Sequence, residues 1–456
     1  MNALYVICGL GFLSLLAEIT NLKKGLAFII IPGIIGATVL IVMDWNTTTH
    51  YYSDMLVFDN FSIAYTALIL IVSALWFWMS SDYFRNQIHE TDRSALVLFA
   101  ISGAIMMVSL ANMAMLFLGI EILSISLYIL AGSKKESLLS NEASFKYFLM
   151  GSFATGFLLM GIALIYGASG SFYILDIAAY INLDGIVLPG FFYVGVLLML
   201  VGMAFKISAV PFHFWAPDVY EGAPTSITAF MSTVVKIAAI GAFYRIFSYI
   251  FNPIQDSWIM VLQVITVLTL IVPNVTAVYQ ISVKRMLAFS SVGHVGYILL
   301  AFISDSITSS PTVFYYLASY SITSIAAFSV LIEVEKSGNA FGFDGLYKRQ
   351  PLLAIVMTVA LLSLAGIPPL AGFFGKYMVF TQAINNGHSG LVIVAVITSL
   401  IGVFYYFRVI IAMFVKKGDE NPMSLPASSR ILMIILLVLI LAMGVLPDSL
   451  ISLLAR

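Results

Sequence analysis

The chain has 456 residues, of which 61% are hydrophobic and only 9% are charged, and its formal net charge is −1. A soluble domain carries about 25% charged residues, so this composition predicts a membrane protein that contacts the lipid bilayer. The low net charge and the lack of a basic stripe argue against nucleic acid as a partner. Cys8 is the single cysteine, which excludes a disulfide framework, a thiolate zinc site and an iron–sulfur cluster held by this chain alone.

Fourteen apolar runs of about 20 residues follow one another, and each is long enough to span a bilayer. The predicted spans are residues 3–20, 25–44, 60–80, 94–111, 113–132, 143–167, 187–215, 225–251, 257–279, 286–304, 312–333, 352–384, 389–415 and 429–447. The first run lacks a basic segment before it and another span follows, so we predict a transmembrane helix and not a cleaved signal peptide. The expected fold class is an all-α membrane protein with 14 transmembrane helices.

Basic residues are distributed unevenly over the loops between these spans. Alternate loops carry Lys23, Lys24, Arg85, Arg93, Lys134, Lys135, Lys284, Arg285, Lys336, Lys348, Arg349, Lys416, Lys417 and Arg430. The opposite loops and the termini carry only Arg245 and Arg456. Because basic loops remain on the cytoplasmic side of a membrane, we predict that both termini lie on the outer side.

Two of the spans are long and interrupted by proline. The seventh is broken at Pro211 and carries Lys206 before the break, whereas the twelfth is broken at Pro368 and Pro369 and carries Lys376 after it. A separation of five spans predicts two five-helix repeats, spans 4–8 and 9–13, and the odd number inverts the second. Broken helices at matching places in inverted halves indicate an ion path near the membrane midplane.

No polar segment is long enough to form a separate soluble domain, so we expect a single polytopic membrane domain over residues 1–456. Its expected divisions are the first three spans (1–92), the first repeat (93–252), the second, inverted repeat (253–416) and the last span (417–456).

Ionisable residues inside the predicted spans are the candidates for chemistry, because charges at membrane depth usually mark ion or proton paths. They include Glu121, Lys146, Lys206, Lys236 and Lys376. Burial disfavours an ammonium and a nearby carboxylate favours it, so a buried lysine can take up and release a proton. We predict that Glu121 pairs with Lys206, since spans 5 and 7 belong to one repeat. A static ion pair that fixes helix packing is the alternative, but four lysines against one glutamate favour a relay.

His294 lies well inside the tenth span, and the ordinary pKa of histidine near neutrality suits a proton relay. The alternative is a histidine held by a carbonyl or by the hydroxyl of Ser290 or Ser291. Its occurrence together with Lys236 and Lys376 favours the relay.

Other polar residues in the spans have plainer alternatives. Lys146 lies one turn into its span. The alternative to a relay role is a lysine whose side chain extends to the membrane interface. Arg408 is two turns from Lys416, so we expect it to extend or pair near the cytoplasmic face. Hydroxyl groups of the eleventh span are candidates for holding waters or for interhelical contacts; they belong to Tyr320, Ser321, Thr323 and Ser324.

The sequence contains no P-loop, metal-ligand cluster or nucleophile triad. The Gly-x-Gly near Cys8 lies inside a span with no preceding strand, so it is not a dinucleotide site. We therefore expect no cofactor and no metal in this chain, and a conduit for protons or cations.

Three stretches resemble the characteristic motifs of the antiporter-like membrane subunits of respiratory complex I: PFHFWAPDVYEGAPTSITAFMSTVVK, VKRMLAFSSVGHVGYILL and LAGIPPLAGFFGK. They occur in the same order as in that family, and the resemblance covers nearly the whole chain. It implies the same fourteen-span core with two inverted repeats.

The resemblance also implies roles for single residues. Glu121 is similar to the family's fifth-span glutamate, and Lys206 to the lysine paired with it. Lys236 is similar to the central lysine of the eighth span. Lys376 is similar to the residue after the double proline, where one sibling subunit looks to have glutamate.

The function that the resemblance implies is proton translocation, coupled to quinone reduction in other subunits of NADH:quinone oxidoreductase. NADH, FMN, iron–sulfur clusters and quinone are then expected in partner subunits, which include homologous antiporter-like subunits. The expected location is a bacterial inner (plasma) membrane, with both termini on the periplasmic side. Two alternatives are a subunit of a multi-subunit Na⁺/H⁺ antiporter and a proton-inert structural spacer, against which the buried lysines argue.

Overall fold

The computed structural model describes residues 1–19, 25–84, 90–183, 185–304, 309–337, 342–418 and 422–454. The described chain is mostly helical and forms two compact units. The first unit is Met1–Trp215 with Gly222–Leu262, and the second is Ala216–Glu221 with Gln263–Arg456.

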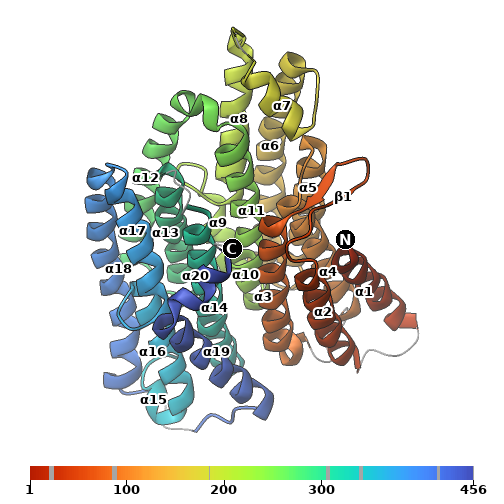
Figure 1. Ribbon diagram of the computed structural model, residues 1–456. Coiled ribbons are helices and arrows are strands. Elements are labelled where there is room, and N and C mark those ends of the chain that lie inside the picture. The colour runs from red at the N-terminus through yellow and green to blue at the C-terminus, as the bar shows by residue number, and fades with distance from the viewer. Residues whose placement is uncertain are drawn as a thin grey trace. The chain divides into compact units, whose positions relative to one another are not determined.

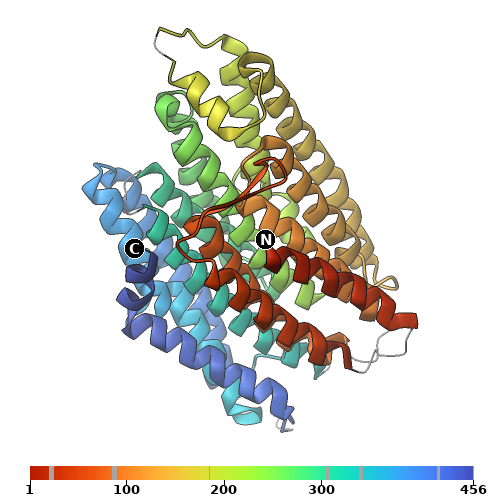
Figure 2. The same cartoon turned by 45° about the vertical axis from the view of Figure 1, so that its right-hand side comes forward.

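The first unit is a bundle of long apolar helices. Its elements are α1 (Asn2–Ile19), α2 (Leu26–Met43), β1 (Thr49–Tyr51), β2 (Leu56–Phe58), α3 (Asn60–Phe84), α4 (Glu90–Val108), α5 (Met113–Ala131), α6 (Leu138–Ser169), α7 (Ile174–Ile181), α8 (Gly190–Lys206), α10 (Thr225–Ser232), α11 (Val234–Tyr244), the π-helix η2 (Arg245–Ile250) and the 3-10 helix η3 (Asn252–Ser257). Helix α6 packs along α8, and α4 packs against α1, α5 and α11 (Figure 1). Helices α1 and α2 run side by side (Figure 2).

The second unit is a further helical bundle built around α14. Its helices are α9 (Trp215–Gly222), α12 (Ile259–Val278), α13 (Val283–Ile303), α14 (Ser309–Lys336), α15 (Leu346–Arg349), α16 (Pro351–Ala365), α17 (Ala371–Asn385), α18 (Ser389–Val415), α19 (Ala427–Val445) and α20 (Pro447–Leu454). Helix α14 is buried along most of its length and packs against α16, α17 and α19.

Within the described residues, twelve helices are long and apolar enough to cross a membrane. They overlap twelve of the predicted spans. Shorter helices occupy the predicted seventh and twelfth spans, because α8 ends at Lys206 and α16 ends at Ala365. Each break contains a cis peptide bond, at Val210–Pro211 and at Pro368–Pro369. The predicted breaks are thus helix ends in the structure.

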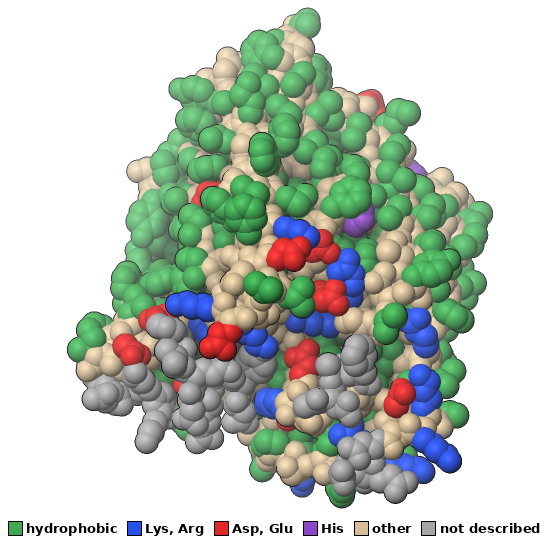
Figure 3. Space-filling model, turned by 180° about the vertical axis from the view of Figure 1, so that it is seen from behind, with side chains coloured by type: hydrophobic (Ala, Val, Ile, Leu, Met, Phe, Trp, Pro, Cys, Tyr) green, Lys and Arg blue, Asp and Glu red, His purple; other side chains and the backbone are tan. Residues whose placement is uncertain are grey.

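The outer faces of these helices are apolar. Large side chains such as Phe28 on α2 and Phe153 on α6 are exposed, and apolar side chains cover most of the face in Figure 3, with charged side chains gathered in one part of it. A soluble protein rarely exposes contiguous apolar surface on this scale, whereas a bilayer solvates it. The chain is therefore a membrane protein, as its composition predicted.

A short hairpin corrects the all-α prediction. Strands β1 and β2 are antiparallel, with Thr49 opposite Phe58, and three-residue strands are too short to show an alternating pattern in the sequence. Separately, the predicted eighth span is subdivided at Thr233, whose φ of −116° and ψ of −79° interrupt the helix between α10 and α11.

The basic residues Arg93, Lys134 and Lys135 share one end of the first unit. The Arg93 guanidinium donates to the carbonyl of Ser133, which places the start of α4 beside the end of α5, where Lys134 and Lys135 follow. Arg245 instead donates to the carbonyl of Val108, at the opposite end of α4. The basic residues predicted to share one side thus lie at one end of this unit, as far as they are described.

The second unit has a comparable charged end. Lys416 lies 3.5 Å from Asp344, the Met423 N–H donates to the Arg349 carbonyl, and Lys336 pairs with Glu333 at 2.7 Å. Four residues of the orientation argument lie outside the described residues: Lys23, Lys24, Arg85 and Arg456. The side of the membrane on which the termini lie stays a prediction.

Arg245 and Asp59 form a two-pronged ion pair that sequence analysis missed. Two guanidinium nitrogens donate to the two carboxylate oxygens at 3.1 and 3.0 Å. Asp59 also caps α3, since it accepts from the N–H and the hydroxyl of Ser62. Burial alone would raise the pKa of Asp59, but the Arg245 guanidinium and the Ser62 bonds together lower it below its ordinary value of 3.8.

Removing one partner of this pair is expected to destabilise the first unit. Arg245→Gln leaves the Asp59 carboxylate, 34% exposed, without its counter-charge, at a cost of about 2 kcal/mol. The lowered pKa means that the contribution is complete above pH 3.8 and is lost as pH falls through the folded-state pKa. The measurement is the melting temperature of the solubilised complex at neutral pH for Arg245→Gln, Asp59→Asn and the double variant. If the losses in melting temperature of the two single variants add up to the loss in the double variant, the two side chains do not stabilise each other directly, and the prediction is contradicted.

Candidate functional site

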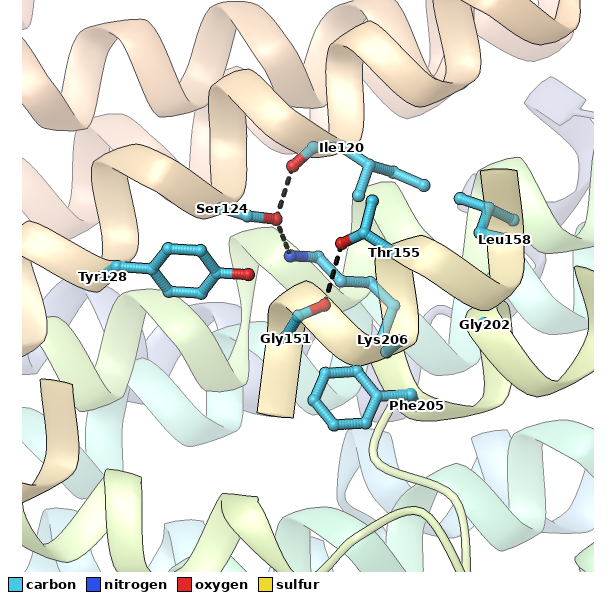
Figure 4. A pocket seen from close by; sticks show the side chains of 10 residues that line it. Ile120, Ser124, Tyr128, Gly151, Thr155, Leu158, Gly202, Phe205 and Lys206 are labelled. Atoms are coloured by element: carbon cyan, nitrogen blue, oxygen red, sulfur yellow. Dashed lines mark hydrogen bonds between the residues drawn. The ribbon is translucent and has the colours of Figure 1, made fainter. Parts of the chain in front are cut away.

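Lys206 is the last residue of α8, immediately before the break in the predicted seventh span. Its side chain is buried, and its Nζ donates to the hydroxyl of Ser124 on α5 at 2.7 Å (Figure 4). The Ser124 hydroxyl in turn donates to the carbonyl of Ile120. The ammonium therefore has a neutral hydroxyl as its hydrogen-bond partner.

A small cavity adjoins Lys206 between α5, α6 and α8. It offers about 10 Å³ to the centre of a water molecule, which is about the lower limit for holding one water. Hydroxyl groups of Ser124, Tyr128 and Thr155 line it together with Lys206, and the Thr155 hydroxyl donates to the carbonyl of Gly151 (Figure 4). The cavity is thus polar enough to hydrate the amine.

Glu121 lies one turn before Ser124 on α5. In the structure Lys206 bonds to Ser124 and forms no ion pair with Glu121, although the carboxylate is near enough to attract the ammonium electrostatically. The hydrogen-bond partner of Lys206 is thus Ser124 and not the predicted Glu121, which acts on the ammonium only electrostatically. Sequence analysis missed Ser124, and the signal for it was its i+3 spacing from Glu121.

Aromatic residues close the other side of the Lys206 site. The Tyr147 ring of α6 stacks on Trp215 with centroids 4.6 Å apart, and Lys206 Nζ lies 5.9 Å from the Tyr147 centroid, within cation–π range. The Trp215 indole N–H donates to the carbonyl of Phe205. The Phe205 carbonyl also accepts from the N–H of Ser208, so Trp215 adds a second donor at the end of α8.

Lys236 lies on α11, three residues after the interruption at Thr233. Every residue of α11 is buried, and the helix packs against α3, α4 and α8. The packing is close, because a Cβ at Gly241 would lie 2.7 Å from the Tyr65 ring. The structure therefore places Lys236 in the interior of the first unit and not at its lipid-facing surface.

Lys376 occupies a corresponding position at the second break. Its Nζ donates to the carbonyl of Ala365, the last residue of α16, at 2.9 Å, and to the hydroxyl of Ser399 on α18 at 2.8 Å. It also lies 4.8 Å from the centroid of the Tyr297 ring. The helix end supplies both a free carbonyl and the negative end of its dipole, so the break itself creates the binding position for the ammonium.

His294 is buried on α13 between two tyrosines. Its Nδ1 is hydrogen-bonded to the Tyr316 hydroxyl of α14 at 2.8 Å, and its Nε2 lies 3.4 Å from the Tyr406 hydroxyl of α18. Tyr406 is hydrogen-bonded to Ser290. The predicted alternative partner Ser290 thus reaches His294 through Tyr406, which sequence analysis did not select.

The remaining predicted positions have local partners. Lys146 is 39% exposed and pairs with Glu142, one turn earlier on α6, at 2.6 Å. Arg408 donates to the carbonyls of Val278 and Gln280 and so caps the end of α12. In the eleventh predicted span, the Thr323 hydroxyl donates to a backbone carbonyl of its own helix, at Ser319.

The structure assigns the predicted relay residues to two groups. Glu121, Lys206 and Lys236 belong to the first compact unit, and His294 and Lys376 belong to the second. A single line through all five residues stays a prediction.

Sequence comparison identifies the family. Residues 110–402 match the family described as NADH:quinone oxidoreductase/Mrp antiporter, TM. The chain is 46% identical over 461 aligned positions to NADH-quinone oxidoreductase subunit N of Cytophaga hutchinsonii, and the alignment covers 99% of each protein. This chain belongs to the NADH-quinone oxidoreductase subunit N family.

Solved structures agree with membership of the subunit N family. A chain of the structure described as "Respiratory complex I from Thermus thermophilus with bound Aureothin" is 30% identical, with a TM-score of 0.84 and coverage of 99% of this chain and 98% of that one. A chain of the Mrp complex from Dietzia sp. has a TM-score of 0.83 at 22% identity over 99% and 94% of the two chains, which shows the fold alone. The chain is thus an antiporter-like membrane subunit of NADH-quinone oxidoreductase, an oxidoreductase complex.

Proposed function

We propose that this subunit translocates protons through a buried relay of lysine, glutamate and histidine, coupled to quinone reduction in other subunits. The relay residues are Glu121, Lys206, Lys236, His294 and Lys376, with Lys146 as a further candidate near the membrane interface. The observation that carries the proposal is the hydrogen bonding of the two lysines at the helix breaks.

Both lysines are buried and bonded to neutral groups, Lys206 to Ser124 and Lys376 to Ser399. A hydroxyl accepts from an ammonium and donates to a neutral amine, so it satisfies either protonation state. A carboxylate partner would hold the proton more firmly. This environment suits the uptake and release of a proton at Lys376, whereas at Lys206 the nearby Glu121 carboxylate favours the charged form.

The proposed architecture has fourteen transmembrane segments, with the two broken ones counted as spans. Spans 4–8 and 9–13 form two inverted five-helix repeats, within the expected divisions 1–92, 93–252, 253–416 and 417–456. The helix ends at Lys206 and Ala365 support this arrangement, because broken helices in matching positions accompany midplane ion sites in transporters.

The proposed setting is the membrane arm of a respiratory complex in a bacterial inner membrane, with both termini on the periplasmic side. NADH, FMN, iron–sulfur clusters and quinone belong to partner subunits in this proposal. Its immediate neighbours are other membrane subunits, including homologous antiporter-like ones. The 46% identity to a subunit N and the likeness to a chain of complex I support this setting.

A subunit of a multi-subunit Na⁺/H⁺ antiporter is the second candidate. The fold shared with a chain of the Mrp complex favours it, but that likeness is weaker in sequence than the match to subunit N. A proton-inert spacer is disfavoured, because burying a lysine costs stability and a spacer would be more stable without it.

The test replaces Lys376 by alanine in the assembled complex. Inverted membrane vesicles receive NADH, and internal acidification is followed with and without sodium. We expect Lys376→Ala to lower acidification by at least about tenfold at equal amounts of complex, independently of sodium. Normal acidification in the variant would contradict a relay role for Lys376, and acidification that requires sodium would favour the antiporter.

A further inference from the structure

A continuous hydrogen-bonded chain runs through His294 in the second unit. Ser290 and Tyr406 are 2% and 1% exposed and are hydrogen-bonded to each other. The Tyr406 hydroxyl also lies 3.4 Å from Nε2 of His294, whose Nδ1 is bonded to the Tyr316 hydroxyl at 2.8 Å. Three helices, α13, α14 and α18, contribute to this buried chain of four residues.

We propose that Ser290 and Tyr406 form a proton-uptake branch that delivers protons to His294. The proposal rests on the proposed relay function of this subunit. Ser290 lies one turn before His294 on α13, on the side of the helix start that carries Arg285. The branch therefore leads from the buried histidine toward the start of α13.

The start of α13 meets solvent at a cluster of charges. The Arg285 guanidinium donates to Asp218 at 2.9 Å and to Glu221 at 2.7 Å, and all three side chains are about one-third exposed. Burial begins at Met286, directly after Arg285 on α13, and Ser290 lies four residues further along, inside the buried stretch. Ser290 is thus the first hydroxyl-bearing residue of α13 beyond Arg285.

Two proton transfers connect Ser290 with the imidazole. A proton arriving at the Ser290 oxygen allows the Ser290 hydroxyl hydrogen to pass to the Tyr406 oxygen. The Tyr406 hydroxyl hydrogen then passes to Nε2 of His294. Each oxygen receives one proton and gives up one, so the hydroxyls are restored and the imidazole carries one additional proton. The imidazolium then donates from both nitrogens, and Nδ1 can pass its proton toward Tyr316.

The hydrogen-bond partners of Tyr406 distinguish it from a buried tyrosine whose hydroxyl only donates to a backbone carbonyl. Its hydroxyl contacts another hydroxyl and an imidazole nitrogen, and both groups can donate or accept. The hydroxyl of Tyr315, next to Tyr316 on α14, donates to the backbone carbonyl of Met443 at 2.7 Å. A carbonyl cannot pass a proton on, so Tyr315 is a matched control.

The test compares Tyr406→Phe with Tyr315→Phe in the complete complex. Each change removes one buried hydroxyl and keeps the ring. In inverted vesicles driven by NADH, we expect Tyr406→Phe to lower acidification by about tenfold at equal amounts of assembled complex, with Tyr315→Phe near normal. Tyr406→Phe should also show a larger solvent deuterium effect than the parent, because proton uptake becomes rate-limiting.

Ser290 provides an independent pair of variants. Ser290→Thr keeps the hydroxyl and should keep acidification, whereas Ser290→Ala should lower it. If the complex with Tyr406→Phe fails to assemble, the comparison of Ser290→Thr with Ser290→Ala tests the uptake branch by itself. Normal acidification in Tyr406→Phe and Ser290→Ala, together with loss in His294→Ala, would overturn the branch and leave the relay in place. Normal acidification in His294→Ala as well would instead remove His294 from the proposed relay.

Discussion

Replacing Lys236 by arginine is expected to lower NADH-driven acidification by at least about tenfold, whereas Lys206→Arg keeps most of it. Arginine retains the positive charge but does not deprotonate in proteins. The two substitutions therefore separate a lysine that must release its proton from one that must only be charged. Lys236, inside a helix buried at every residue, is the candidate for release.

Lys206 is the candidate for a fixed charge. It is close enough to Glu121 for electrostatic attraction, so its charge affects the field along the proposed relay. The adjoining cavity leaves space beside the amine, and hydroxyls of Ser124 and Thr155 line it. A planar guanidinium, although larger, thus has room and acceptors at this position. Lys206→Ala removes the charge and is expected to impair acidification.

The measurement is acidification by inverted vesicles at equal amounts of assembled complex, determined on native gels. The assembly check matters because a larger side chain at position 236 enters close packing. Near-normal and equal acidification in Lys206→Arg and Lys236→Arg would mean that both lysines act as fixed charges. Lys236 would then no longer qualify as a proton-releasing group.

Much of the helical framework was predictable because a bilayer imposes a length on every apolar run. The break after Lys206 and the break before Lys376 were predictable for another local reason, since a proline removes a helical hydrogen bond and kinks or breaks a helix. Pro32 and Pro273 nevertheless lie inside α2 and α12, so proline alone does not fix where a helix ends. The β1–β2 hairpin was not, because its strands are too short for a periodic pattern. The interruption at Thr233 had no proline or glycine to indicate it.

The candidate site was predictable in its charges but not in its partners. A lysine or histidine in an apolar run is visible in the sequence, so His294 and Lys376 were selected. Their hydrogen bonds depend on residues more than twenty positions away, such as Ser399 for Lys376 and Tyr316 and Tyr406 for His294. Serine and tyrosine are common in membrane helices as interhelical contacts, so their residue type alone could not distinguish these from the others.

Gly366→Ala is expected to displace Lys376 and to slow acidification by about tenfold. Gly366 ends α16 in the left-handed conformation, with φ +86°, and a Cβ there would lie 2.8 Å from Cδ of Lys376. The lysine side chain is flexible, so it would move rather than the backbone. Its ammonium would then lose the hydrogen bonds to Ala365 and Ser399. In a buried position water does not readily replace these acceptors.

The matched control is Gly387→Ala, just after α17. Gly387 has φ +82°, and a Cβ added there would meet no atom within 4 Å, so alanine adds the same backbone strain, about 1 kcal/mol, without touching Lys376. Acidification and melting temperature are measured for both variants. Strain alone predicts equal losses in the two, whereas displacement of Lys376 predicts similar melting temperatures and a loss of acidification in Gly366→Ala only. Near-normal acidification in both variants would show that Lys376 tolerates the displacement, and its bonds to Ala365 and Ser399 would then not be required for proton transfer.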